Sequence, residues 1–375
     1  MDKRKESGAA SLFAVIFSAM LLTILAAGFV KLMLKDQQQA INNDLSQSAY
    51  DAALAGVEDA KRVIRACQKG NASACDALEK KDCNSVRQSS VLGGAGNAQE
   101  TLVQTNSSNG RKFDQAYTCL KVSMDTEDFL YVGAENKVQL VPLRARGAFD
   151  KVIIEWFNKE DNANKNVALA DVHNGDIGLP EKATWSTQAP AVLRAQVITP
   201  GNNFTIDSLD SSSASQAVFL RPNGIVSGVP AVENVVHKGS LRRATDTPTT
   251  RNEPTGVLCS KDFAHPHGHS CRAIIELDEV SPEASANAFL AINHLYKGAN
   301  VRVSVMKGTE QVMLYGTQPA VDSTGRANNL FRRVEARLRL GEDIWYPAGS
   351  VEVLNNLCKD FSLAGNIVEG GACDS

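Results

Sequence analysis

The chain is poor in aromatic residues, carries little net charge, and has no proline before Pro142. Aromatic residues make up 6% of the 375 residues, and the formal net charge is −3. Proteins that bind nucleic acid usually present a basic surface with stacking aromatics, so we expect no nucleic-acid partner. The missing proline leaves the N-terminal third free to form one long, uninterrupted helix.

Sequence patterns of familiar catalytic and cofactor sites are also missing. There is no P-loop and no HExxH motif, and the segment GIVSG at 224–228 has the wrong spacing for a GxSxG nucleophile turn. The Asn/Asp-rich segment 160–176 lacks the ligand order and the terminal glutamate of a calcium loop. We therefore expect a protein that is not an enzyme and needs no cofactor.

The eight cysteines all follow the apolar N-terminal segment, and none forms a CxxC pair, which argues against a zinc ribbon or a thioredoxin-type site. An even number on one side of a membrane-length segment favours disulfides in an oxidising exterior over buried thiols. The pairing stays open, with Cys259–Cys271 and Cys358–Cys373 the easiest short-range closures. The disulfide candidates are Cys67, Cys75, Cys83, Cys119, Cys259, Cys271, Cys358 and Cys373.

Three of the six histidines, His265, His267 and His269, alternate between Cys259 and Cys271. Imidazoles this close together are candidate ligands for zinc or copper. The intervening Pro266 and Gly268 indicate a turn, however, and oxidised cysteines are not metal ligands. An exposed loop closed at its base by a disulfide is the favoured interpretation, with no metal bound.

The most apolar part of the sequence runs from Ala9 to Val30 and contains no charged residue. A helix of this length spans the ~30 Å hydrocarbon core of a bilayer. Lys3, Arg4 and Lys5 precede it and place the N-terminus in the cytoplasm by the positive-inside rule. The run is longer than a secretory signal and lacks a good cleavage site for one, so we expect a single-pass segment in the inner membrane.

The apolar run continues into an amphipathic stretch that ends near Ala66. Its apolar residues recur at steps of three and four, which is typical of a helix with one buried face. We therefore predict one helix over residues 9–66, of which 9–30 cross the membrane. The apolar positions of the second half are Ile41, Leu45, Ala49, Ala52, Ala53, Ala60, Val63 and Ile64.

The basic leader KRKESG, the apolar run AASLFAVIFSAML and the long helix together resemble the N-terminus of a type IV prepilin. The resemblance implies that a prepilin peptidase removes the leader, residues 1–8, by cutting between Gly8 and Ala9. It also implies methylation of the new terminus at Ala9. Residues 9–30 would lie in the inner membrane first and then pack against other pilins in the core of an extracellular pilus.

Within that group, the segment QSAYDAALAGVEDA at 47–60 resembles the end of the long helix in PilX-type minor pilins. Segments 331–340 and 356–365 are similar to the same family. Major pilins carry a glutamate at the fifth position after cleavage, where this chain has Phe13. Because a buried carboxylate needs a partner charge, the resemblance makes Phe13 the residue that distinguishes a minor subunit from the main building block.

The rest of the chain changes from polar to strand-like. Residues 67–123 read as a loop-rich disulfide region. From residue 116 onward, β-branched and aromatic residues form many short runs, and alternation is clearest in 300–308, 310–318 and 330–341. Three consecutive alternating runs predict an antiparallel meander with one solvated face.

The predicted fold class is therefore α+β, with the long helix packed on an antiparallel sheet. An inserted β-rich lobe is expected over 124–270, and the antiparallel sheet with a C-terminal disulfide loop over 271–375.

These expectations describe a minor pilin-like subunit that acts in filament assembly or priming and in adhesion to a host cell, another bacterium or a substratum. A pseudopilin at the tip of a type II secretion system is one alternative, because it also lacks the glutamate and carries a large head. A single-pass anchored extracellular domain of another function is the second.

Overall fold

The computed structural model describes residues 7–93, 99–103, 114–162, 166–169, 181–201, 215–224 and 254–339, with side chains from Leu12 onward. The fold is α+β, as predicted: one long N-terminal helix and three β-sheets. The chain divides into two compact units. Unit 1 comprises Met1–Ser123 and Ala320–Leu338, and unit 2 comprises Met124–Pro319 and Arg339–Ser375.

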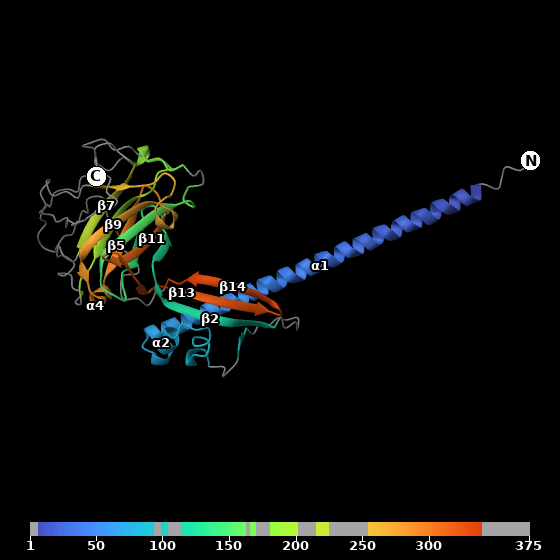
Figure 1. The fold of residues 1–375 in the computed structure, drawn as a ribbon, viewed down its shortest axis with the longest axis horizontal. Helices are drawn as coiled ribbons and strands as arrows, with labels where there is room; N and C mark the ends of the chain where they lie inside the picture. Colours follow the sequence, from blue (N-terminus) through green and yellow to red (C-terminus); the bar gives the residue numbers. More distant parts are fainter. Residues whose placement is uncertain are drawn as a thin grey trace, which may run out of the picture. The chain divides into compact units, whose positions relative to one another are not determined.

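Helix α1 runs without a break over Ser7–Gln68, 62 residues, and is therefore about 93 Å long (Figure 1). The chain leaves the helix at Gly70, two residues after Gln68, where the φ of +89° is readily adopted only by glycine. The N–H groups of Gly70 and Asn71 donate to the carbonyls of Cys67 and Ala66 and close the last turn. Asn71 then caps helix α2 (Ala72–Glu79) by accepting a hydrogen bond from the N–H of Ala74.

In unit 1, the second half of α1 lies along a four-stranded sheet, as Figure 1 shows for β2, β13 and β14. The strand pairs β1–β2 and β13–β14 are antiparallel. Only residues 115–123 of β2 and 320–327 of β13 belong to this unit. In sheet order, the strands are β1 (Thr101–Leu102), β2 (Gln115–Thr126), β13 (Leu314–Ala327) and β14 (Leu330–Arg337).

Small residues let the helix and the sheet approach closely. A Cβ added at Gly325 on β13 would lie 2.0 Å from the carbonyl oxygen of Ala49, and one at Gly56 would lie 2.3 Å from Oγ of Ser323. Ala49, Ala52, Ala53, Ala60, Val63 and Ile64 of the predicted stripe are buried. Ile41 is 57% exposed, so the docked face begins later than the periodicity suggests.

One hydrogen bond reinforces this contact. The hydroxyl of the buried Tyr117 on β2 donates to Oδ2 of Asp59 on α1 over 2.7 Å. Burial, followed by the neighbouring carboxylate, raises the pKa of Tyr117 well above its usual value, so the phenol stays protonated as the donor.

Disulfide bonds are present, as expected. Cys67 at the end of α1 pairs with Cys75 in α2, and Cys83 pairs with Cys119 on β2. The second bond closes a separation of 36 residues, because β2 brings Cys119 back to the segment after α2. Cys358 and Cys373 lie outside the described residues.

Unit 2 contains two five-stranded sheets. In the first sheet the β7–β8 pair is parallel and the remaining pairs are antiparallel. Its order is β4 (Val138–Pro142), β10 (Phe289–Leu295), β6 (Val192–Ile198), β7 (Ser215–Asn223), β8 (Thr255–Leu258). The second has β12 (Glu310–Val312), β11 (Asn300–Lys307), β5 (Phe149–Asn158) and β9 (His269–Val280), with β3 (Phe129–Val132) also on β11.

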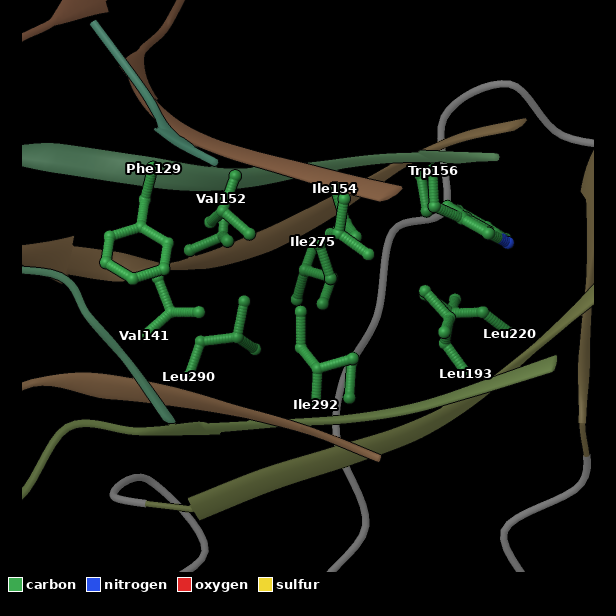
Figure 2. Packing of buried hydrophobic residues seen from close by; sticks show 14 of the residues in the cluster. Phe129, Val141, Val152, Ile154, Trp156, Leu193, Leu220, Ile275, Leu290 and Ile292 are labelled. Atoms are coloured by element: carbon green, nitrogen blue, oxygen red, sulfur yellow. The ribbon is translucent and has the colours of Figure 1, made fainter. Parts of the chain in front are cut away.

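The apolar core of unit 2 lies between these two sheets. Figure 2 shows Val152, Ile154 and Ile275 of one sheet pointing toward Leu290 and Ile292 of the other. The buried indole N–H of Trp156 on β5 donates to the carbonyl of Ala191, just before β6, over 2.9 Å. The one polar atom of this large core side chain therefore has a hydrogen-bond partner on the opposite side of the sandwich.

The strands are grouped differently from the sequence-based expectations. Strands on both sides of position 270 belong to the same sandwich, so unit 2 extends from Met124 to Pro319 and the expected boundary at 270/271 falls inside β9. The three alternating runs do not form one meander. They form two hairpins, β11–β12 and β13–β14, in different sheets, because the chain leaves one sheet after β12.

A fully buried histidine lies in unit 2 beside β3. The ring of His294 on β10 meets Tyr131 edge-on at a centroid distance of 5.6 Å. A Cβ at Gly133 would lie 2.1 Å from its Nε2. Neither ring nitrogen meets hydrogen-bond geometry with a described residue. Burial lowers the pKa of His294 from 6.5 to about 4, and the nearby backbone of Lys137 offsets only part of that effect.

We predict that Gly325→Ala separates α1 from its sheet. The added methyl group overlaps helix backbone, which cannot rotate away, so unit 1 should lose about 2–3 kcal/mol of stability. Hydrogen exchange of the α1 amides between Ala49 and Ile64 should accelerate. Gly28→Ala is the control, because a Cβ at Gly28 meets nothing within 4 Å. Equal exchange in both variants would contradict the close-packing account.

We also predict that His294 makes unit 2 sensitive to acid. Because the pKa is near 6.5 when unfolded and about 4 when folded, the unfolded chain takes up the proton first as pH falls, and stability is lost between those values. His294→Phe should reduce the loss between pH 7.5 and 4.5 by about 2–3 kcal/mol. Urea unfolding followed by Trp156 and Trp185 fluorescence measures the free energy of unfolding at both pH values. If His294→Phe loses as much stability as the wild-type protein between pH 7.5 and 4.5, His294 is not the cause of the acid sensitivity.

Candidate functional site

The first half of α1 is an apolar surface that no described part of the chain covers. Fifteen large apolar side chains between Leu12 and Leu34 are 49–76% exposed. By length and composition, α1 is the one helix among the described residues that is able to cross a membrane. This is consistent with a single-pass anchor, because each such side chain gains about 1.5–3 kcal/mol on leaving water.

The predicted processing residues lie at the start of this helix. Gly8 and Ala9 are in the first turns of α1. Phe13 is 76% exposed, the highest value among the exposed large apolar residues of the apolar half. The helix therefore presents an aromatic ring at the position that separates minor from major pilins in the resemblance.

The three clustered histidines lie in and beside a tight surface turn that a disulfide closes. Cys259 pairs with Cys271, and Pro266–Gly268 form a short 3₁₀ turn in which His267 has a φ of +61°. This disulfide also joins the end of β8 to β9, which belong to different sheets of the sandwich.

The turn places the three imidazoles in different surroundings. Nε2 of His265 lies 3.2 Å from the carbonyl of Leu258, while Nδ1 of His267 lies 3.1 Å from Oε2 of Glu155. His269 is buried in β9, and desolvation lowers its pKa despite the charge of Glu155. Within the described residues no group of three or more His, Cys, Asp or Glu side chains is arranged to hold a metal ion.

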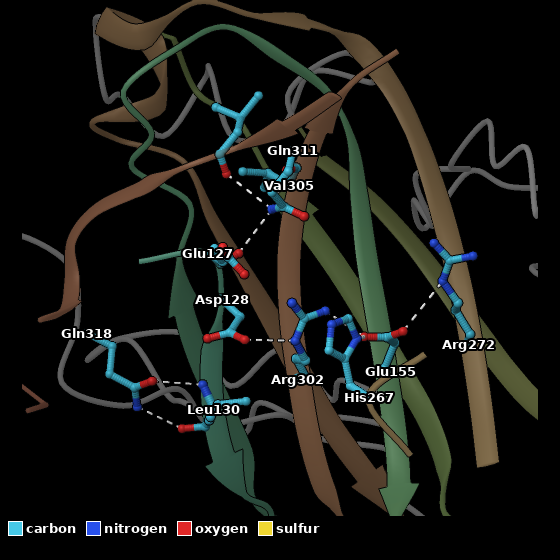
Figure 3. Close-up of polar contacts among 11 residues, drawn as sticks. Glu127, Asp128, Leu130, Glu155, His267, Arg272, Arg302, Val305, Gln311 and Gln318 are labelled. Atoms are coloured by element: carbon cyan, nitrogen blue, oxygen red, sulfur yellow. Dashed lines mark hydrogen bonds and ion pairs between the residues drawn. The ribbon is translucent and has the colours of Figure 1, made fainter. Parts of the chain in front are cut away.

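The carboxylate of Glu155 is the centre of a buried ionic network (Figure 3). Its side chain is 1% exposed, and Oε2 lies 2.7 Å from Nη1 of Arg302. Arg302 in turn donates through Nε to Asp128 over 2.8 Å, and Arg272 lies 3.6 Å from Oε1 of Glu155. Two carboxylates and two guanidinium groups balance in a row across β11, β5 and β9, so removal of one of them would leave an uncompensated charge.

Nothing in the periodicity of β5 predicts this network, and it was missed from sequence. The available signal is the single glutamate inside the apolar run VIIEWF. A charged residue there must find partners on neighbouring strands, but the partner strands are identified only by the register, which places Glu155 opposite both Arg302 and Arg272.

A glutamine side chain covers the free edge of β3. The amide of Gln318 donates to the carbonyl of Leu130 over 2.7 Å and accepts from its N–H over 2.8 Å (Figure 3). Gln318 is 3% exposed. It therefore occupies the hydrogen-bonding positions that a neighbouring strand would take, which protects this edge from pairing with another chain.

An open hollow lies beside the β13–β14 turn of unit 1. Its basic group is already neutralised, because Arg326 bonds to Glu100, to Asp114 and to the carbonyl of Asn328. Hydrogen bonding from Arg326 lowers the pKa of Asp114. The lining residues are Asn42, Leu45, Asp114, Arg326, Asn328, Asn329 and Leu330.

No family model, curated protein or solved structure matches the chain. Function must therefore be argued from the residues and the geometry given above.

We predict that Glu155→Gln destabilises unit 2 by about 2–4 kcal/mol, because it leaves the buried guanidinium group of Arg302 and the partly buried one of Arg272 short of negative charge. The control is Glu276→Gln on the neighbouring β9. Glu276 is 42% exposed and pairs with Lys151 at 3.9 Å, so we expect a loss below about 1 kcal/mol. Urea unfolding followed by tryptophan fluorescence measures both, and similar losses would show that the Glu155 network is not a stabilising centre.

Proposed function

We propose that the protein is a minor pilin-like subunit of a type IV pilus. In this proposal, the first half of α1 anchors the precursor in the inner membrane. After the leader is removed, the same surface packs against the helices of other pilins. The head acts in filament priming and in adhesion to a cell or another surface, without catalysis.

The observation that carries the proposal is that one half of α1 is exposed while the other half is packed on a sheet. Between Leu12 and Leu34 the large apolar side chains are exposed, whereas Ala49 to Ile64 are docked on the chain's own sheet. A plain anchor needs only the apolar half. A rigid continuation fixed to the folded head is what a subunit needs when the helix holds the head in an assembly.

Local chemistry supports the same proposal. The basic residues Lys3, Arg4 and Lys5 precede Gly8, which is the arrangement on which the prepilin resemblance rests. Phe13 removes the cost of an unpaired carboxylate in an apolar environment, which favours a minor subunit. Three disulfides on the far side of the apolar segment are in keeping with an oxidising exterior.

The pseudopilin of a type II secretion system is the second candidate, favoured by Phe13 together with the large two-unit head. A single-pass anchored domain with an uncleaved N-terminus is the third. The mature N-terminus distinguishes the anchored domain, which keeps its leader, from the two pilin-like candidates. Deletion of the protein distinguishes those two: loss of pili indicates the minor pilin, and loss of secretion indicates the pseudopilin.

We predict that mass spectrometry of the mature protein finds methylated Ala9 as its first residue. Gly8→Val should block cleavage and leave a protein heavier by its eight leader residues, retained in the membrane and missing from sheared pili. Ser7→Ala, one residue earlier, is the control and should be processed normally. An intact leader in the wild-type protein would overturn the proposal.

A further inference from the structure

Two exposed arginines of unit 2 lie over one tyrosine ring. The guanidinium carbon of Arg146 is 3.6 Å from the ring centroid of Tyr315, and that of Arg144 is 4.9 Å from it. The intervening Ala145 forms an antiparallel bridge with Leu314. Residues two apart in extended chain point to the same side, so both cations lie on the face that carries the tyrosine.

The backbone that presents this face is held rigidly. The N–H of Tyr315 donates to the carbonyl of Arg144, and the N–H of Arg146 to that of Met313, each over 2.9 Å. The N–H of Ala145 donates to Oγ of Ser285 over 3.1 Å. Ala145 and Leu314 are buried beneath the face. The arginines are therefore positioned before any ligand arrives, which lowers the entropic cost of binding.

The two arginines of this face differ in their partners. Nε of Arg146 donates to Asp125 over 2.7 Å. The side chain of Arg144 makes no hydrogen bond or ion pair with a described residue, and its guanidinium group lies over the tyrosine ring. Among the described residues, Arg144 therefore keeps an exposed guanidinium group with unused donors beside a second cation.

We propose that Arg144 and Arg146, held on Tyr315, bind a carboxylate or sulfate group of an acidic polysaccharide outside the cell. Stacking on the ring leaves the edge of a guanidinium group free, and its fork of N–H donors matches the two oxygens of an oxyanion. The proposal needs only an exterior location for unit 2, so it can fail or succeed independently of leader cleavage.

A polymer fits this face better than a free ion or a membrane. The face is open to water, where one charge pair at 4 Å contributes only about 1 kcal/mol, too little to retain a single small ion. A polysaccharide offers many identical groups to each face, and to several heads displayed together. A bilayer surface is recognised by clusters of basic residues, whereas here one of only two arginines is paired with Asp125.

The test uses the full chain in nonionic detergent, with fluorescent heparin as the probe and dextran as its uncharged counterpart. Arg144→Gln should weaken heparin binding about 5–10-fold, the equivalent of about 1–1.4 kcal/mol. Arg144→Lys should lose less, because it keeps the charge without the fork. Arg333→Gln is the matched control: its exposed guanidinium pairs with Asp322 on the β13–β14 hairpin, and we expect less than a twofold change.

Thermal unfolding establishes that each variant is folded before binding is compared. Equal weakening by Arg144→Gln and Arg333→Gln would overturn the proposal, since net charge alone would then explain the binding. Binding to dextran, or no binding to heparin, would also overturn it. If inorganic phosphate competes with heparin when its concentration equals that of the sulfate groups of heparin, the face is reassigned to a free ion. If phosphatidylglycerol vesicles bind and heparin does not, it is reassigned to a lipid headgroup.

Discussion

The close approach of α1 to the sheet of unit 1 is the contact on which the rest of the molecule depends. At Gly325 there is no room for a single methyl group between the strand and the helix backbone. Such an approach requires small residues on both sides, and the alanines and Gly56 of α1 provide them. Because the contact is tight, it holds the helix in one rotational setting on the sheet of unit 1 and fixes the direction in which the exposed half of α1 leaves that sheet.

The two units are stabilised by different means. Unit 1 has a small core and adds two disulfides, which connect the end of α1 to α2 and the following segment to β2. Unit 2 has a large apolar core between two sheets, and the Cys259–Cys271 disulfide joins these sheets at an edge.

The polar features of unit 2 follow from the same sandwich. Strand register aligns Glu155 with arginines on both neighbouring strands, and Asp128 supplies the second negative charge of the row. Gln318 covers an edge strand, and His294 occupies a site that disfavours its charged form. Arg144 differs from these groups because it is exposed and prearranged, and no side chain among the described residues pairs with its charge. That contrast separates a face available to a ligand from groups whose partners lie within the fold.

Local sequence patterns determined much of the architecture. The uninterrupted helix, its apolar and amphipathic halves, most strands and the presence of disulfides could be predicted, because each depends on residues within one or two turns or along one strand. The fully buried strand β10 has no alternation to reveal it. Segments 300–308 and 330–341 were recognised as strands but were wrongly assigned to one sheet, since periodicity carries no information on which strand lies next to which.

Tertiary structure alone decided the partners of those elements. The pairing of Cys83 with Cys119, the network around Glu155 and the placing of Arg144 and Arg146 over Tyr315 all join residues far apart in sequence. Their energies come from contacts that exist only after the chain has folded. The sequence by itself determined which segments form helices and strands and which of them are apolar, and the packed structure decided which charges are balanced and which remain exposed.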